Sequence, residues 1–462
     1  MHLFQLLIHG ASASLLLDVG RKVANDPLAP NVYRRAAAGT HNTDSIVIGN
    51  AKYYYYAEVS LGTPQQKLDV QIDTGSSDLW VMHSSNPYCS LPKSDPSYVD
   101  CSQHLVFDPA KSSSYRQSDE DFRITYADST FASGRMARDV LGIGSASVPN
   151  CQFALASKAN SGQIVMGIGF QADESTDHKY RNVPMILKDA GITSTRAYSL
   201  WLNDLHATSG SLLFGAVDHT KYAQKLGIVP IVSTDQGQKP NAMNIMFHGI
   251  SIGAQDVKDT NLVECSIPVL LDSGTSYIYL PDHMIQVMGQ ALGMQYNQNS
   301  GMYEGPYPKH QKGYISFNFS GVILRAPLDL MIDPIDGSGG KYQLLVSSSG
   351  GITNILGDVF LRAAYVVYDL DHYQVGLGQA KFNVQSDDIE PITSTIPGTM
   401  APHYSHTTEK FVHTANLHRA VNLVAHPEGP AATGGHVHEY TEPARHTHGL
   451  VQQSQRQVAD QI

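Results

Sequence analysis

The sequence predicts a mostly β protein built from two related halves. Tyr, Gly and Pro are plentiful, with 24, 39 and 23 residues among 462, whereas long segments with helical periodicity are scarce. A turn of the type Asp-[Thr/Ser]-Gly, flanked on both sides by apolar strand-like residues, occurs at 73–75 and again at 272–274. Each copy is followed by further strand patterns and then by an apolar segment that contains glycine. The repeated order indicates an internal duplication.

The composition excludes some classes of partner. The formal net charge is −11 at pH 7, and nucleic-acid binding needs clustered Lys and Arg, so we expect no nucleic-acid partner. No apolar run reaches the roughly eighteen residues of a membrane-spanning helix. The carboxyl end, residues 451–462, is polar and lacks the hydrophobic tail of a glycolipid-anchor signal. We expect a monomer without a membrane span.

The first half is expected to consist of strands joined by tight turns. The Tyr-rich residues 53–61 predict a strand that ends at Gly62-Thr63-Pro64. Residues 68–82 predict two apolar strands joined by the Asp73 turn. A polar loop follows, and the alternating segment 122–126 then forms a β-hairpin with Tyr126 near its tip. Further strands are expected at 131–134, 163–170 and 210–215, and residues 218–225 lead out of this half.

The second half repeats this order. The Asp272 turn lies between apolar strands, and residues 281–292 predict an amphipathic helix. Strands are expected at 314–319, 354–361, 364–369 and 374–380, of which 354–361 corresponds to the apolar, glycine-containing strand of the first half.

Four regions are expected along the chain. Residues 1–35 form a signal and pro-segment, 36–225 the N-terminal lobe, 226–383 the C-terminal lobe, and 384–462 a tail. Two interpretations of the amino terminus stay open. Residues 3–8 are apolar and residues 11–13 are small, as in a secretory signal. However, His9-Gly10 interrupts the apolar run and no basic residue precedes it, which favours an irregular start instead. The tail holds nine of the 21 histidines with little periodicity, which predicts disorder.

Four cysteines are too few for a disulfide scaffold. Cys89 and Cys101 lie close together in a loop rich in Ser, Pro and Asp, which favours a local disulfide in a secreted chain. For Cys151 and Cys265 two interpretations stay open, a second disulfide or two small buried side chains.

The paired turns carry the predicted chemistry. If they face each other across a pseudo-two-fold axis, Asp73 and Asp272 lie within hydrogen-bonding distance, and two carboxylates so close cannot both ionise cheaply. One keeps a proton while the other accepts a proton from a bound water, which attacks a peptide carbonyl. The reaction requires no covalent nucleophile, metal or other cofactor, so we expect none. The supporting residues are Thr74, Gly75, Ser76, Ser273, Gly274 and Thr275, which shape the turns, cross-link them and hold the carboxylates.

With these motifs the chain resembles the pepsin-like aspartic endopeptidases, in particular fungal secreted or yapsin-like members, over residues 53–381. The resemblance is carried by both Asp turns, Leu79-Trp80, Ile124-Thr125-Tyr126 and the two apolar segments around Gly167 and Gly357. It implies a bilobal, mostly β fold with a cleft between the lobes and activity at acidic pH on protein or peptide substrates. It also implies that Tyr126 lies on a flap that closes over the substrate, supported by Trp80. Aspartic proteases are the standard example of a carboxyl pair that shares one proton.

The flap departs from the family pattern at two positions. Ala127 stands where glycine usually follows the tyrosine, and Ser129 stands where many fungal members have a second glycine. Losing both glycines is expected to stiffen the flap tip or change its turn. Asp128 remains at the position of the acidic flap residue, which in the family helps to accept a basic side chain in the substrate pocket.

Two other functions compete with this interpretation. A pepsin-like protein without proteolysis, acting as a binding or inhibitor protein, would be supported by the altered flap, but both catalytic turns are complete. A metal-binding or adhesion role of the tail would rest only on its histidines, such as His436 and His438.

Several features favour the secretory pathway or the extracellular space. Arg34-Arg35 resembles a processing site that releases a pro-segment, as in a zymogen, and Asn318-Phe319-Ser320 is an acceptor sequence for N-glycosylation. The expected Cys89–Cys101 disulfide agrees with this location.

Overall fold

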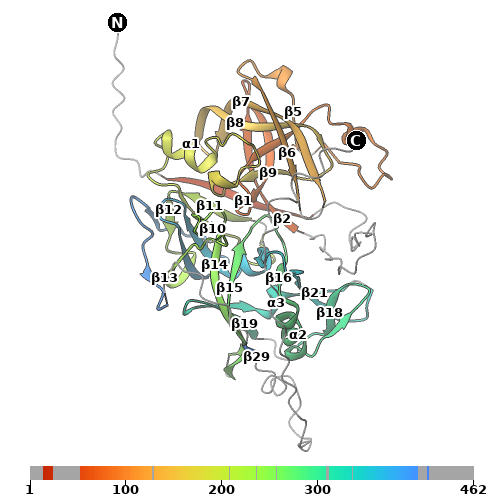
Figure 1. Cartoon of the computed structure of the whole chain (residues 1–462), viewed down its shortest axis with the longest axis vertical. Coiled ribbons are helices and arrows are strands. Elements are labelled where there is room, and N and C mark those ends of the chain that lie inside the picture. Colours follow the sequence, from red (N-terminus) through yellow and green to blue (C-terminus); the bar gives the residue numbers. More distant parts are fainter. Residues whose placement is uncertain are drawn as a thin grey trace, which may run out of the picture. The chain divides into compact units, whose positions relative to one another are not determined.

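The structure is a computed structural model of the whole chain (Figure 1). It describes residues 14–23, 53–102, 104–126, 129–207, 209–235, 237–255, 257–308, 312–335, 337–403 and 414–415. Strands dominate these residues, as the sequence predicted.

The strands of the first half follow one another with few helices between them. They are β1 Leu15–Val23, β2 Tyr53–Leu61, β3 Gln66–Asp73, β4 Leu79–His83, β5 Val106–Phe107, β6 Arg116–Thr125, β7 Phe131–Ile143, β8 Ala146–Ala159, β9 Ile164–Gly167, β10 Ala197–Trp201, β11 Ser209–Phe214, β12 Ala216–Asp218 and β13 Tyr222–Pro230. One α-helix, α1 Val183–Asp189, and three short 3-10 helices, Pro87–Ser90, Pro109–Lys111 and Gln171–Asp173, lie among them.

The second half has a similar composition. Its strands are β14 Asn244–Ala254, β15 Val257–Leu271, β16 Ile278–Leu280, β17 Gln295–Asn297, β18 Met302–Pro306, β19 Gly313–Phe319, β20 Val322–Pro327, β21 Ile332–Pro334, β22 Lys341–Leu344, β23 Val346–Ser348, β24 Ile355–Leu356, β25 Ala364–Asp369, β26 Gln374–Ala380, β27 Ile389–Pro391, β28 Thr399–Met400 and β29 Thr414–Ala415. Its helices are α2 Asp282–Ala291, α3 Leu328–Met331 and α4 Asp358–Leu361.

The duplication is visible in the strand pairing around each Asp turn. In the first half β3 pairs in parallel with β9, so that Asp73 lies opposite Gly167, and β9 also pairs antiparallel with β4. In the second half β15 pairs in parallel with β24, which also pairs antiparallel with β16. Each Asp turn therefore connects two strands that flank the same inserted strand.

The largest sheet of the described residues contains strands from both halves. Its order is β28-β13-β26-β25-β10-β11-β1-β2-β3-β9-β4-β8-β7-β6. Residues 364–369 and 374–380 lie in the C-terminal half of the sequence, but β25 pairs with β10 and β26 pairs with β13. The two halves are thus joined by a continuous hydrogen-bonded sheet. A second sheet, β20-β19-β14-β15-β24-β16-β23, belongs to the C-terminal half alone (Figure 1).

Alternating burial explains how the strands next to the first Asp turn are held. Tyr55, Ala57 and Val59 on β2 are buried at every second position, and so are Val70 and Ile72 on β3. Such alternation fixes the register, because a shift by one residue would expose every buried side chain. The register of β3 in turn fixes where Asp73 lies.

The segment predicted as a strand at 354–361 divides into two elements. Only β24 is extended, and after Gly357 the chain turns into α4. The backbone N–H groups of Asp358 and Val359 donate hydrogen bonds to the carbonyl oxygens of Thr275 and Ser276, at 2.8 and 3.0 Å. These bonds direct the chain into a helix beside the second Asp turn, a tertiary effect that the apolar pattern does not reveal.

Both ends of the described chain pack against the lobes. Strand β1, within the expected signal and pro-segment 1–35, lies between β11 and β2 in the large sheet. The segment that follows residue 383 also packs, since β27 pairs with β12, β28 pairs with β13, and Ile392 and Ile396 are buried. The part described through residue 403 is therefore ordered beyond the boundary that the composition suggested.

The cysteines follow one of the expected patterns. Cys89 and Cys101 form a disulfide, which confirms that prediction. Cys151 and Cys265 are both buried and free, so the second interpretation, two small buried side chains, is correct. Among the described residues no helix has the length and apolar character needed to cross a membrane.

A buried carboxyl in the first half links stability to pH. Glu174 is 3% exposed, and its Oε2 accepts a hydrogen bond from the backbone N–H of Tyr180 at 2.7 Å. Burial, assisted by the nearby charge of Asp78, raises the pKa of Glu174 from 4.5 to about 8. The folded protein therefore holds a proton here that the unfolded chain releases.

We expect this proton to make the protein less stable as pH rises. The stabilisation is complete below about pH 4.5, the pKa in the unfolded chain, and is lost progressively up to about pH 8. Glu174→Gln, which mimics the neutral form, should flatten the decline in melting temperature between pH 4.5 and 7.5. Asp177→Asn, in the same loop but exposed, should leave the slope unchanged; parallel curves for wild type and Glu174→Gln would contradict the assignment.

Candidate active site

Asp73 is held at the end of β3 by its own turn. Its Oδ1 accepts a hydrogen bond from the backbone N–H of Gly75 at 2.8 Å, and its Oδ2 accepts one from the Ser76 hydroxyl at 2.5 Å. The residue is only 7% exposed. Because both oxygens are held, the carboxyl group has one orientation.

Asp272 has the same arrangement in the second half. Its Oδ1 accepts from the backbone N–H of Gly274 at 2.8 Å, and its Oδ2 accepts from the Thr275 hydroxyl at 2.6 Å. It is 8% exposed. The two turns therefore hold their carboxyl groups with equivalent bonds, as a pseudo-two-fold axis requires.

Thr74 and Ser273 lock the two turns together. The backbone N–H of Thr74 donates to the Ser273 hydroxyl at 3.2 Å, and that of Ser273 donates to the Thr74 hydroxyl at 3.0 Å. Each hydroxyl then donates to a carbonyl oxygen of the opposite half, Thr74 to Leu271 and Ser273 to Ile72, at 2.9 and 2.8 Å. The four bonds are buried and symmetric, so they fix the spacing of the turns.

The turn glycines allow each carboxyl to approach the opposite turn. A Cβ atom added to Gly75 would lie 2.5 Å from the Cγ of Asp272, and one added to Gly274 would lie 2.4 Å from the Oδ1 of Asp73. Each carboxyl thus occupies the space that a side chain on the opposite glycine would fill. The structure brings Asp73 and Asp272 together, as the sequence predicted.

The closeness of the two groups changes their ionisation. Burial raises the pKa of Asp73 well above its ordinary value, and the charge of Asp272 and a hydrogen bond with that residue raise it further. The bonds from Ser76 and Gly75 oppose this shift. Asp73 therefore keeps its proton to a higher pH than an ordinary aspartic acid does.

Tyr126 and Trp80 meet at the hairpin formed by β6 and β7. The indole N–H of Trp80 donates to the Tyr126 hydroxyl at 2.6 Å, and the ring centroids are 6.5 Å apart. Trp80 is fully buried on β4, directly after the Asp73 turn. The hairpin tip is closed by the backbone N–H of Tyr126, which donates to the carbonyl oxygen of Thr130.

The hairpin tip includes one of the two positions where the family usually has glycine. Ser129 has φ of 70°, in the left-handed region that glycine adopts without strain. A serine in this conformation is strained where glycine would not be, and the stiffness of the expected flap stays a prediction. Ala127 and Asp128 lie outside the described residues, so the proposed role of Asp128 stays a prediction.

Sequence reasoning missed a third carboxyl near the pair. Asp358, at the start of α4, is 1% exposed. Burial raises its pKa well above the ordinary value, and the charges of Asp272 and Asp73 add to the effect while Arg362 opposes it. Asp358 therefore holds its proton more tightly than an ordinary aspartic acid does. The one sequence signal was its position directly after Gly357, at the end of the repeated apolar segment.

The remaining predicted residues lie elsewhere. Asn318, on β19, accepts a hydrogen bond from the backbone N–H of Gly321 at 2.9 Å, and its glycosylation stays a prediction. The Cys89–Cys101 disulfide closes the loop between β4 and β5. Neither belongs to the group around the two Asp turns.

Comparison with known proteins identifies the family. Residues 54–380 match the family model of eukaryotic aspartyl proteases, which covers well over half of the sequence. The chain belongs to this family.

Curated relatives and a solved structure agree with this assignment. The chain is 37% identical to aspartic proteinase yapsin-3 of Saccharomyces cerevisiae, over 80% of this chain and 74% of the relative. It is 35% identical to an acid protease of Saccharomycopsis fibuligera, over 77% of this chain and 88% of the relative. The crystal structure of an aspartic proteinase from Irpex lacteus has the same fold, with a TM-score of 0.57 and 22% identity over 72% of this chain and 96% of that one. The protein is a fungal pepsin-like aspartyl protease with the bilobal, mostly β fold.

We expect Gly274→Ala to disable the site while leaving the strands intact. The added Cβ would overlap the Asp73 carboxyl, so one turn must move away from the other. A displacement of about 1 Å can cost on the order of a hundredfold in kcat. The measurement is kcat on an unfolded protein at acidic pH. Gly162→Ala, where an added Cβ meets no atom within 4 Å, is the matched control; equal activity of both variants would contradict the close packing of the turns.

We expect Tyr126→Phe to weaken catalysis modestly. The change removes the hydroxyl that accepts from Trp80 but keeps the ring, and one such bond is worth about 1 kcal/mol, or roughly fivefold in kcat/KM. Steady-state kinetics on a short peptide would measure this. Tyr314→Phe, which removes an equally short bond to Asp259 on another strand, should leave kcat/KM unchanged.

Proposed function

We propose that this protein is an endopeptidase in which Asp73 and Asp272 activate a water molecule for attack on a peptide bond. The observation that carries the proposal is the symmetric pair of buried carboxyls, each held by a backbone N–H group and a hydroxyl of its own turn. The names of the relatives, aspartic proteinase and acid protease, support the same reaction class.

The chemistry follows from the single shared proton. The ionised carboxyl accepts a proton from a water bound between the two groups, and the water oxygen attacks the peptide carbonyl carbon. The protonated carboxyl donates to the carbonyl oxygen and stabilises the developing charge. The tetrahedral intermediate then collapses as the amide nitrogen takes a proton and leaves. At the end the pair again holds one proton, so it returns to its starting state.

The supporting residues keep this pair rigid. Ser76 binds the Oδ2 atom of Asp73, and Thr275 binds the Oδ2 atom of Asp272. The Oδ1 atoms, which accept from the turn glycines, then face the water and the substrate. Thr74 and Ser273 prevent the two turns from separating. Tyr126, supported by Trp80, closes over the bound peptide.

Nothing observed favours a non-catalytic binding or inhibitor protein. That alternative requires a damaged turn or a missing carboxyl, and both turns carry their complete sets of hydrogen bonds. The altered flap affects only the closing of the site.

The secretory pathway is the proposed location, with processing at Arg34-Arg35 as in a zymogen. The Cys89–Cys101 disulfide supports an oxidising compartment. Strand β1 precedes the dibasic pair, so cleavage there would leave it attached to the lobes by pairing with β11 and β2 alone. Amino-terminal sequencing of the mature protein from culture medium checks both points, and an intact residue 34–36 segment would contradict the processing.

We expect Asp73→Asn and Asp272→Asn each to lower kcat by several orders of magnitude without unfolding the protein. An amide cannot exchange the proton, although it preserves the size of the side chain. Because the pKa of Asp73 is raised, wild-type activity should be present while the pair holds one proton and should fall as pH rises through that pKa. Hydrolysis of unfolded haemoglobin from pH 3 to 8 measures both effects. Ser161→Ala, a buried hydroxyl outside the two turns, is the control; full activity of either Asn variant would remove the assignment.

A further inference from the structure

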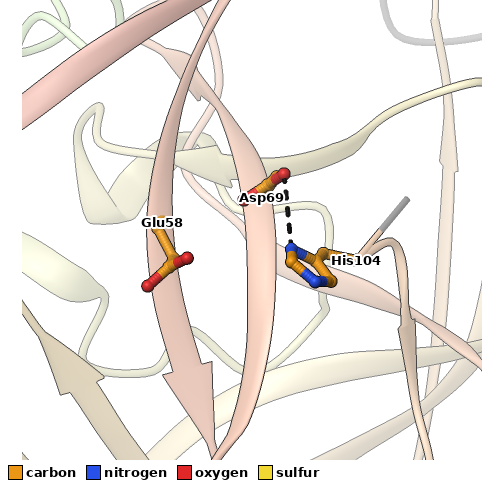
Figure 2. A group of neighbouring side chains, drawn as sticks. All are labelled: Glu58, Asp69 and His104. Atoms are coloured by element: carbon orange, nitrogen blue, oxygen red, sulfur yellow. Dashed lines mark ion pairs between the residues drawn. The ribbon is translucent and has the colours of Figure 1, made fainter.

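Three side chains with metal-binding atoms meet on β2, β3 and the loop after the disulfide. They are Glu58, Asp69 and His104, and one ligand atom from each lies within 4.8 Å of the others. Figure 2 shows the two carboxylates on neighbouring strands and the His104 imidazole turned toward Asp69. None of the three belongs to the candidate active site.

The backbone places these side chains together. Glu58 and Asp69 are direct partners in the antiparallel pairing of β2 and β3. The backbone N–H of Asp69 donates to the carbonyl oxygen of His104 at 3.0 Å, which holds the loop beside β3. His104 has φ of 54°, a conformation that histidine adopts more readily than most residues other than glycine.

Two ion pairs that involve this group are weak. Like charges directly opposite each other on neighbouring strands are destabilising. Lys67 lies 2.7 Å from Glu58, but their side chains are 64% and 49% exposed, so this ion pair contributes little. The Nδ1 of His104 is 3.7 Å from the Oδ2 of Asp69, which is too long for a hydrogen bond and is an ion pair only when the imidazole is protonated.

Asp69 lies in a partly enclosed place. The Asp69 side chain is 12% exposed. The neighbouring Tyr54 has its pKa raised to about 12, first by burial and then by the charge of Asp69. The group therefore offers two carboxyl groups and one imidazole, with Lys67 beside Glu58.

We propose that Glu58, Asp69 and His104 bind a divalent cation of the zinc type, with water completing the coordination. Two carboxylate oxygens and one imidazole nitrogen form a donor set suited to Zn²⁺, and Mn²⁺ is the next best match. Ligand atoms about 2.0–2.2 Å from a common ion lie within about 4.4 Å of each other. Small rotations of the exposed Glu58 and His104 side chains close the remaining gap, and Lys67 turns away into solvent.

The bound ion stabilises the fold and takes no part in hydrolysis. It cancels the repulsion between β2 and β3 and ties the loop after Cys101 to β3, the strand that ends at Asp73.

Calorimetric titration of the full-length protein with ZnCl₂ at pH 7.5 tests the proposal. Wild type should bind one more equivalent than His104→Gly or Glu58→Gln. Glycine tolerates the left-handed backbone at 104, and Glu58 is exposed, so both variants keep the fold. The histidines beyond residue 383 bind equally in all three proteins and cancel in the comparison.

His178→Ala is the matched control. Its Nδ1 also lies 3.7 Å from a carboxylate, that of Glu120, but no second carboxylate completes a group of three among the described residues. Zn²⁺ should raise the melting temperature of wild type and His178→Ala but not that of His104→Gly or Glu58→Gln. Equal stoichiometry in wild type and both site variants, or an equal rise in melting temperature in all four proteins, would overturn the proposal.

Discussion

Two carboxyl groups that share one proton must be held against each other, although their charges repel. This constraint explains the central part of the structure. The reciprocal bonds between Thr74 and Ser273 provide the force that holds the turns, and Gly75 and Gly274 provide the space. Burial prevents water from screening the interaction, so the pKa of Asp73 stays high. A change in any of these parts should alter how the two carboxyl groups share a proton.

The sheets hold the two Asp turns in position relative to the rest of the chain. Each Asp turn is fixed by an inserted strand, β9 in one half and β24 in the other. The pairing of β25 with β10 and of β26 with β13 then joins the halves, so that neither turn depends on its own lobe alone. Glu58 and Asp69 lie on the strands that lead to the first Asp turn. An ion bound to them would therefore change the stability of the first half and leave the reaction itself unchanged.

The hairpin tip at Tyr126, the proposed flap, is where this sequence departs from the family pattern. The bond between Trp80 and Tyr126 is retained, but Ser129 adopts a backbone conformation that glycine would adopt without strain. Replacing the glycines therefore changes how the hairpin tip bends, whereas the hydrogen bond from Trp80 holds Tyr126 in position. Buried acids such as Glu174 add a second link to acidic pH, through stability instead of catalysis.

The sequence by itself determined the fold class, the duplication, the two catalytic candidates and the Cys89–Cys101 disulfide, because each depends on local patterns that recur or lie close together in the chain. It also predicted β25 and β26 at their correct residues, because their apolar patterns are continuous. Only the tertiary structure showed that these strands pair with the first half, that residues 358–361 form a helix, and that Asp358 lies beside the paired carboxyls. These features depend on contacts between segments far apart in sequence. The same reason applies to Glu58, Asp69 and His104, which are unremarkable in the sequence and become a group only when β2, β3 and the following loop are placed side by side.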